Sequence, residues 1–444
     1  MAQGAPWRTS HRVIFVIALV VAVTGFLAIA AVGHAFFDLK VYYGALNYWH
    51  DGGSIYDFLK PGTKYGFTYP PFAALVMLPM AYVPWPLAIV ISVALSVVTS
   101  ALLLWWLVEP IARRVGWNHW FALAVALCLA AAFEPMRETV DFGQVNMLLL
   151  FLVGADLLRL VGQGSRWAGV GIGLATAIKL TPGVFILYLL VTGRWRAAFT
   201  AMGTAVAATL FAGAVAPDAS RTFWTEALWN TDRVGALDFI SNQSLRGVVA
   251  RLNPSDPSTA AWLALVVLTL AVWVWRSRAA AAAGDEAAGL ALTGALSCLI
   301  SPVTWVHHLV WLLPALVLLV DNAYLAPAGS RRRRWLLGSA IVAYGFLISR
   351  IVWVWERDFS GVLGFVGGNL YVWISLALLV ALPIRCRSQV AGSTQSGGQP
   401  RSGASGGEAG QLAEPGDVAQ LGKPYRRPSP RPLKFENHSF AVGH

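Results

Sequence analysis

The sequence predicts an all-α polytopic membrane protein: a bundle of about 10–12 transmembrane helices, with re-entrant or half-helices and outer-face loops. Apolar residues make up 57% of the 444 residues, and charged residues make up 12%. Many apolar stretches reach the roughly 20 residues that a helix needs to cross a bilayer. The alternating pattern of a membrane β-barrel is absent from the sequence. These observations exclude a soluble globule.

Lys and Arg cluster between the apolar stretches, and short loops rich in these residues stay in the cytoplasm. The clusters are Arg8 and Arg12, Arg113 and Arg114, Arg159 and Arg166, Arg194 and Arg196, Arg276 and Arg278, Arg331 to Arg334, and Arg385 and Arg387. With all of them inside, the crossings are expected at 13–33, 85–108, 119–134, 144–162, 197–216, 259–276, 287–304, 306–320, 335–353 and 369–385. The stretch 167–192 begins and ends beside such charges, so we expect two half-helices there, broken at Lys179, Thr181 and Pro182.

Three parts of the chain are predicted: a cytoplasmic N-terminus over 1–12, a membrane domain over 13–387, and a disordered cytoplasmic tail over 388–444. The tail is rich in Gly, Ser, Pro and Gln and lacks the apolar residues for a core. The formal charge of +11 places basic loops against anionic lipid headgroups and does not indicate nucleic acid. The three cysteines form no disulfide or metal-binding pattern.

This threading puts most polar clusters on the outer side, which indicates a site open to the outer leaflet. Asp38 ends the first apolar stretch, where an ionisable side chain is costly unless it meets water, a partner or a substrate. It is a candidate catalytic base, and the alternative is a solvated acid that ends the helix. Tyr42 follows at helical spacing and is a candidate sugar contact.

Lys179 lies deep, at the helix break, where exposed backbone groups can also hold an anion or a sugar. Its alternative is to extend toward the cytoplasmic surface. His307 and His308 point about 100° apart on a helix, so they lack the i, i+4 spacing of a zinc site. One of them is expected to contact a phosphate or orient a carboxylate, and the other to pack.

Amides and aromatic residues supply candidate sugar contacts. The motif SNQSLRG combines Asn242, Gln243 and Arg246 near tryptophans, a mixture suited to stacking on sugars and holding a phosphate. The alternative is an amphipathic loop on the membrane. The further candidates are Tyr69 in YGFTYPPF, Gln144 and Asn146 in FGQVN, and Trp305 in SPVTWVHH. Structural roles remain open for each.

Together, the motifs FFDLKVYY, YGFTYPPFAAL, FGQVNMLLL, KLTPGVF, SNQSLRG and SPVTWVHH resemble the polytopic glycosyltransferases of family 87, in particular its PimE-type mannosyltransferases. The resemblance covers about 12–387 and implies that this part is a catalytic domain with the GT-C fold. It also implies transfer of mannose from polyprenyl-phosphate mannose to a mannosylated phosphatidylinositol. The bond formed is expected to be α-1,2, on the outer side of the plasma membrane. Branches of lipomannan or lipoarabinomannan are an alternative acceptor.

Carried over, the resemblance makes Asp38 the general base of an inverting attack, since a carboxylate can take the proton of the acceptor hydroxyl. His307 is placed with it as a catalytic residue. His308, Arg246 and Lys179 are the candidates to bind the donor phosphate. No paired carboxylate motif for a metal stands out in an outer loop, and no nucleotide-binding loop is present. We therefore expect transfer that needs neither metal nor cofactor.

Two other classes of protein remain open. Broken helices with intramembrane charges also mark transporters, including flippases of lipid-linked sugars. A non-catalytic scaffold is the third reading. No clear internal repeat is visible, and the polar motifs gather at the outer ends of the apolar stretches, which favours surface chemistry.

Overall fold

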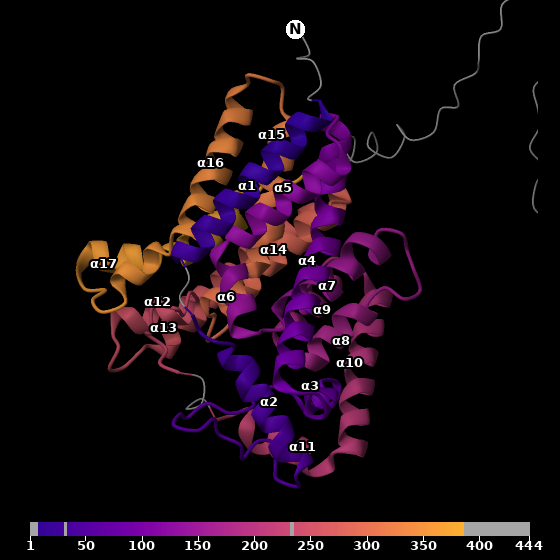
Figure 1. The fold of residues 1–444 in the computed structure, drawn as a ribbon, viewed down its shortest axis with the longest axis vertical. Coiled ribbons are helices and arrows are strands. Elements are labelled where there is room, and N and C mark those ends of the chain that lie inside the picture. Colours follow the sequence, from indigo (N-terminus) through magenta and orange to yellow (C-terminus); the bar gives the residue numbers. More distant parts are fainter. Residues whose placement is uncertain (1–7, 31–32, 231–234, 386–444) are drawn as a thin grey trace, which may run out of the picture. The chain divides into compact units, whose positions relative to one another are not determined.

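The computed structural model describes residues 8–30, 33–230 and 235–385, and these ranges are mostly helical (Figure 1). Within them, strand-like pairing is limited to one isolated bridge between Leu59 and Gly66. The predicted all-helical fold is confirmed. The predicted tail at 388–444 and most of the predicted N-terminal segment lie outside the described residues.

A helix occupies each expected crossing. These helices are α1 (Thr9–Ala30), α4 (Trp85–Val115), α5 (His119–Ala132), α7 (Asn146–Ala155), α10 (Trp195–Val215), α13 (Thr259–Ala283), α14 (Glu286–Ile300), α15 (Leu313–Leu325), α16 (Arg331–Ser349) and α18 (Leu370–Ala381). Shorter helices connect them: α2 (Phe37–His50), α3 (Pro71–Met77), α6 (Glu134–Phe142), α8 (Val170–Ile178), α9 (Val184–Val191), α11 (Pro217–Thr222), α12 (Leu245–Leu252) and α17 (Gly361–Gly368).

By length and composition, five helices in the described ranges can cross a membrane, or up to seven if each bent pair is one span. The bent pairs are α5 with α6, at 72°, and α17 with α18, at 58°. Other expected crossings are shorter apolar helices, such as α14. The chain is a multi-pass membrane protein whose bundle contains broken helices, as predicted.

The expected break near Lys179 is present. Helix α8 stops at Ile178, Lys179 is extended with φ −149° and ψ 130°, and the short 3₁₀ turn Thr181–Gly183 leads into α9. Pro182 stands in this turn, where its missing N–H and fixed φ suit a helix start. The break presents the Lys179 side chain to the interior between neighbouring helices.

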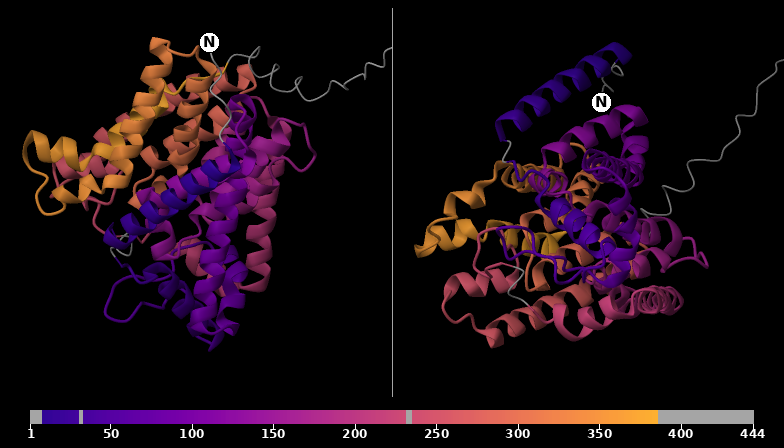
Figure 2. Two further views of the ribbon diagram at one scale, coloured as in Figure 1. Left: turned by 45° about the horizontal axis from the view of Figure 1, so that its top comes forward. Right: turned by 60° about the horizontal axis from the view of Figure 1, so that its bottom comes forward.

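Helix α14 lies at the centre of the bundle, where Ala287 to Leu299 are all buried. It packs against α13, α15 and α18. Helix α1 differs, because none of its residues is buried and its main neighbour is α5. Figure 2 shows α1 running along the outside of the other helices. The face of α1 that points away from α5 is therefore open to lipid.

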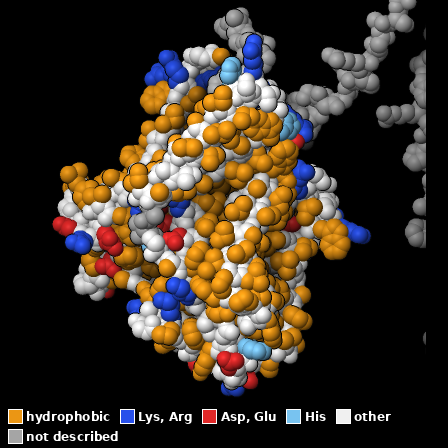
Figure 3. Space-filling view, viewed as in Figure 1, with side chains coloured by type: hydrophobic (Ala, Val, Ile, Leu, Met, Phe, Trp, Pro, Cys, Tyr) orange, Lys and Arg blue, Asp and Glu red, His pale blue; other side chains and the backbone are white. Residues whose placement is uncertain are grey.

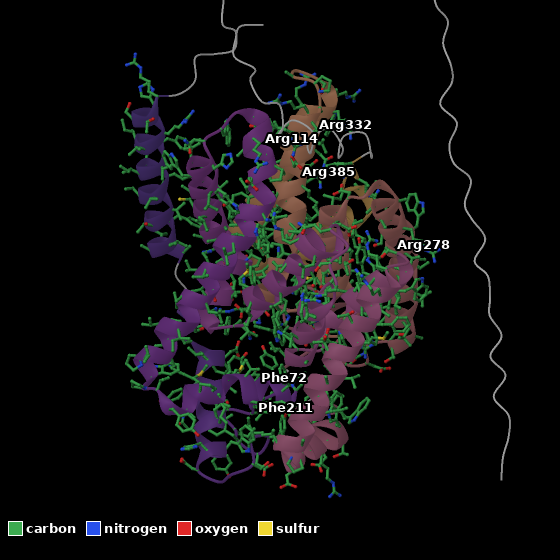
Figure 4. The ribbon with its side chains drawn as sticks, turned by 90° about the vertical axis from the view of Figure 1, so that its right-hand side faces the viewer. Phe72, Arg114, Phe211, Arg278, Arg332 and Arg385 are labelled. Carbon is green, nitrogen blue, oxygen red and sulfur yellow. The ribbon has the colours of Figure 1, made fainter. Side chains whose placement is uncertain are left out.

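The two ends of the bundle differ in their charges. Arg114, Arg332 and Arg385 lie toward one end, which we call the arginine end, whereas Phe72 and Phe211 lie nearer the other (Figure 4). Helices α2, α3 and α11 form the opposite end, which we call the Asp38 end (Figure 1). The threading expected from basic clusters places the arginine end in the cytoplasm.

Candidate active site

A turn with an unusual backbone precedes Asp38. Ala35 and Phe36 have φ values of 51° and 57°, a left-handed conformation that side chains other than glycine rarely adopt. Asp141 of α6 stabilises the turn: its Oδ2 accepts the backbone N–H of His34 at 2.7 Å, and its carbonyl accepts that of Phe36 at 2.8 Å. Such a conformation persists where the surroundings fix it, so α6 sets the direction in which α2 begins.

The end of α6 also packs closely against the first turn of α2. Gly143 ends α6 with φ 72°, and a Cβ atom added to it would lie 2.5 Å from Cβ of Leu39. Only glycine suits both the backbone conformation and this approach. The contact brings the next residue, Gln144, beside Asp38.

A chain of hydrogen bonds leads to the Asp38 carboxylate. The Tyr42 hydroxyl donates to the Tyr69 hydroxyl at 2.9 Å, which donates to Oε1 of Gln144 at 2.8 Å. Nε2 of Gln144 donates to Oδ2 of Asp38 at 2.6 Å. This order makes the amide a donor to the carboxylate, and in the described part of the chain Oδ1 receives no hydrogen bond. That oxygen remains available to a substrate proton.

Burial raises the pKa of Asp38 to about 6, although the side chain keeps some exposure. The hydrogen bond from Gln144 and the positive charges of Lys179, His34 and Lys60 act in the opposite direction and lower this pKa. The carboxylate is therefore ionised at neutral pH and is more basic than an ordinary aspartate. Both properties suit a general base.

Lys179 reaches the hydrogen-bond chain of Tyr42, Tyr69 and Gln144 from the break between α8 and α9. Its Nζ donates to Oδ1 of Asn146 at 3.2 Å and to the Tyr69 hydroxyl at 3.4 Å, and it lies 3.1 Å from Nε2 of His308. All three partners are neutral groups. The lysine charge thus has no carboxylate in hydrogen-bond contact within the described ranges.

The tautomer of His308 follows from its neighbours. The backbone N–H of Trp305 donates to Nδ1 of His308 at 3.1 Å, so a neutral ring carries its proton on Nε2. That Nε2–H then faces the Lys179 ammonium. Both groups are donors, and neither can accept a hydrogen bond from the other. An anionic oxygen at this point would accept from both, so the pair forms a candidate phosphate site.

His307 is buried and belongs to a row of rings. Its carbonyl accepts from Oγ1 of Thr139 at 2.9 Å and from Nδ2 of Asn146 at 3.2 Å, while its Nε2 has no hydrogen-bond partner in the described residues. Its ring lies 5.0 Å from that of Phe142 and 4.5 Å from that of His308. His34 stacks on Phe142 at 4.0 Å. The rings of Phe142, His307 and His308 therefore lie between His34 and Lys179.

On the His34 side, the charges are paired. Nε2 of His34 lies 3.2 Å from the Glu138 carboxylate, and Arg350 donates to the same carboxylate at 2.5 Å. Burial lowers the pKa of His34, but Glu138 outweighs it, and the net shift is upward. The partners of Glu138 come from distant segments, which spacing along the chain does not reveal.

The side chains of four predicted site residues lie apart from this cluster. The buried amides of Asn242 and Gln243 are bonded to the backbone: Nδ2 of Asn242 donates to Leu237 O at 2.8 Å, and Nε2 of Gln243 to Gly368 O at 2.8 Å. Arg246 donates to Thr259 Oγ1 at 3.2 Å and stacks on Trp262, while the Trp305 ring meets Phe239. The structure joins the other predicted residues: Asp38, Tyr42, Tyr69, Gln144, Asn146, Lys179, His307 and His308.

Lys60 is a charged neighbour of Asp38 that sequence reasoning did not single out. It lies in the turn between Leu59 and Gly66, with Nζ 4.0 Å from the centre of the Phe37 ring. Its loop position gave no sign that the turn folds back onto α2. Among the described residues, no three His, Cys, Asp or Glu side chains cluster as a metal site would require. Metal independence stays a prediction.

The comparisons with known proteins agree with the resemblance drawn from the motifs. The model of glycosyltransferase family 87 matches residues 67–302. The chain is 30% identical over 406 residues, which is 84% of this chain and 91% of the relative, to the polyprenol-phosphate-mannose-dependent α-(1-2)-phosphatidylinositol mannoside mannosyltransferase of Mycobacterium tuberculosis. It is 32% identical over 319 residues, 68% of this chain and 74% of the relative, to the corresponding pentamannoside mannosyltransferase of Mycolicibacterium smegmatis.

Among solved structures, the crystal structure of ArnT from Cupriavidus metallidurans bound to undecaprenyl phosphate is 17% identical, with a TM-score of 0.36, over 84% of this chain and 77% of that one. The family match and the relatives define the class of protein: a multi-pass membrane glycosyltransferase. The chain belongs to glycosyltransferase family 87.

Proposed function

We propose that this glycosyltransferase moves mannose from polyprenyl-phosphate mannose to a mannosylated phosphatidylinositol and forms an α-1,2 bond. The named activities of the relatives support the donor and the class of acceptor. The observation that carries the mechanism is the setting of Asp38. Its carboxylate is bonded to the amide of Gln144 and lies next to the candidate phosphate site of Lys179 and His308.

The reaction follows an in-line displacement at the anomeric carbon of the donor. The acceptor hydroxyl oxygen forms the new C–O bond, and its proton passes to Oδ1 of Asp38. The bond from the anomeric carbon to the phosphate oxygen breaks, and polyprenyl phosphate leaves with the bonding electrons. Attack opposite the leaving group inverts the configuration, so a β-linked donor gives an α-linked product.

Lys179 and His308 stabilise the leaving phosphate. Two donors fixed in place before the reaction stabilise negative charge as it develops, and they need little rearrangement to do so. Asn146 and Tyr69 hold Lys179, and the backbone of Trp305 holds His308. His307 contributes by placing His308 beside the row of rings, while Tyr42 and Gln144 orient the base.

The reaction is tested with purified protein in vesicles, labelled polyprenyl-phosphate mannose and a phosphatidylinositol mannoside acceptor. We expect labelled glycolipid to form, and we expect an α-1,2-specific mannosidase to release the label. A product resistant to that enzyme contradicts the linkage. Transfer only to lipomannan or lipoarabinomannan would show that these polymers are the acceptor. Movement of labelled lipid between leaflets without a new glycoside would show that the protein is a transporter.

The Asp38 end is proposed to face the outside of the plasma membrane. The basic residues at the other end support this orientation. Single cysteines at the exposed positions Asp51 and Arg331 test it in intact cells with a thiol reagent that does not cross membranes. Labelling at position 51 alone is expected, and labelling at position 331 alone contradicts the orientation.

A further inference from the structure

A groove of about 550 Å³ lies between α1, α4 and α5, and it ends at charged residues of α6. Its volume is within the range of ligand pockets, roughly 300–1,000 Å³. Its apolar walls include Leu27, Ala30, Val97, Leu127, Ala131 and Met136. In Figure 3, acidic and basic side chains interrupt the otherwise apolar face on which α1 lies.

The walls of the groove suit a hydrocarbon chain. Two hydroxyl groups line it, but Ser100 Oγ donates to the carbonyl of Ser96 at 2.5 Å, so that hydroxyl is already satisfied by its own helix. Val97 is 54% exposed, and α1 has no buried residue, so the groove is not sealed from the lipid around the bundle. A chain can therefore enter sideways from the membrane.

The closed end of the groove is polar but nearly balanced in charge. Glu138 and Arg350 line it and are bonded to each other, and Asp141 holds the turn before Asp38. Arg137 also lines it, with its guanidinium 5.0 Å from the centre of the Phe26 ring on α1. Its Nε is buried and has no hydrogen-bond partner in the described part of the chain. Its Nη2 donates to Ile348 O at 3.1 Å, and the guanidinium keeps further N–H donors for a hydroxyl or ester oxygen of a ligand.

The charged end of the groove lies beside the turn that leads to Asp38. Phe36 lines the groove two residues before Asp38, and the ring of Phe142 separates this side from His307, His308 and Lys179. In an in-line displacement, the acceptor enters opposite the leaving phosphate. If Lys179 holds that phosphate, the acceptor comes from the groove side. The charges there are largely paired, so they attract the donor phosphate less than the Lys179 site does, and they can bond to sugar hydroxyls of the acceptor.

We propose that this groove binds an acyl chain of the glycolipid acceptor, with sugar hydroxyls or an ester oxygen at Arg137 and the reacting hydroxyl at Asp38. The groove is thus an acceptor site rather than the site of the donor's prenyl chain. This inference rests on the proposed function, because it assumes a glycolipid acceptor and a phosphate held by Lys179.

Two matched pairs of variants test the groove from opposite walls. Val97→Trp fills it from α4, and Val98→Trp is its control: the neighbouring valine is also 54% exposed but does not line the groove. Leu27→Trp fills it from α1, and Ile29→Trp is the control on the lipid-facing side. Each protein is assayed with the acylated acceptor, with the same acceptor after deacylation, and over a range of donor concentrations.

The groove variants are expected to raise KM for the acylated acceptor about tenfold or more, which corresponds to the loss of contacts with part of one chain. KM for the donor and the activity with the deacylated acceptor should match those of the controls. A rise in donor KM instead assigns the groove to the prenyl chain and overturns the proposal. Equal effects on both acceptors, or no effect, also overturn it.

The failure of the proposed function looks different. In that case the unaltered protein transfers no mannose to either acceptor, and no comparison among variants arises. Transfer by the unaltered protein with an unchanged KM in Val97→Trp and Leu27→Trp rejects the groove alone.

Discussion

Carboxylates at the two ends of the bundle have different partners. At the arginine end, Asp285 accepts several hydrogen bonds from Arg385, and Asp321 is paired with both Arg385 and Arg114. At the Asp38 end, Asp38 accepts its hydrogen bond from the amide of Gln144. The paired acids join α4, α14 and α15 to the chain that follows α18. Asp38 instead lies between cations that it does not contact by hydrogen bonds.

This difference separates stability from chemistry. Both carboxylate oxygens of Asp285 and of Asp321 already accept hydrogen bonds, so neither residue has an oxygen free to take a substrate proton. A carboxylate that is partly desolvated and bonded to an amide binds a proton more readily, which is what a general base requires. The variants below sharpen the comparison, starting with the largest expected effect on the rate.

Asp38→Asn is expected to lower kcat by about 10²- to 10⁴-fold, because the amide cannot accept the acceptor proton. The measurement is transfer of labelled mannose by equal amounts of folded protein. Asp51→Asn, at the exposed end of the same helix, is the control and should keep its activity. Full activity in Asp38→Asn would remove this residue as the base.

Lys179→Met is expected to slow transfer about 10²-fold, because the leaving phosphate loses one of its two fixed donors. Lys64, which is exposed in the 59–66 turn, provides the control, and Lys64→Met should transfer mannose at the normal rate. A donor whose phosphate is a better leaving group should recover much of the loss in Lys179→Met. No such recovery would mean that Lys179 acts on the structure alone.

Asp141→Leu is expected to lower kcat about tenfold with little change in donor KM, because the turn that aims Asp38 loses the acceptor of the His34 N–H. Asp141→Asn keeps an oxygen at that position and should restore most of the rate. Equal losses in both variants would contradict a positioning role for Asp141.

Arg385→Met should have the smallest effect on the rate and a large one on stability. Removing one partner of a buried ion pair costs about 3–5 kcal/mol, because it leaves the other charge uncompensated. We expect a lower thermal midpoint in detergent, with normal kcat for the protein that remains folded. A loss of kcat without a loss of stability would break the distinction between the two ends.

The sequence was informative wherever one residue type carries a strong physical constraint. Apolar length predicted the helices, and a proline beside Lys179 predicted the break between α8 and α9. Asp38 stood out because carboxylates are costly at a membrane boundary. These features depend on local sequence, and the structure contains each of them.

Features that depend on distant contacts were not predictable in the same way. Arg350 meets Glu138 because α16 ends beside α6, and His34 meets it because the turn before α2 is bonded to α6. Nothing in their spacing indicates either contact. Asn242 and Gln243 resembled sugar-binding amides by composition, yet the fold buries them against backbone carbonyls. Polar side chains in a loop do not reveal whether they face a ligand or their own backbone.

The most direct test of Asp38 as the base is the dependence of single-turnover transfer on pH. Because burial raises the pKa of Asp38 to about 6, the rate should fall as pH drops through that value, when the carboxylate becomes protonated. Gln144→Leu removes a hydrogen bond that lowers this pKa, so the acidic limb should move to higher pH. An acidic limb that is absent, or that stays in place in Gln144→Leu, would contradict the account.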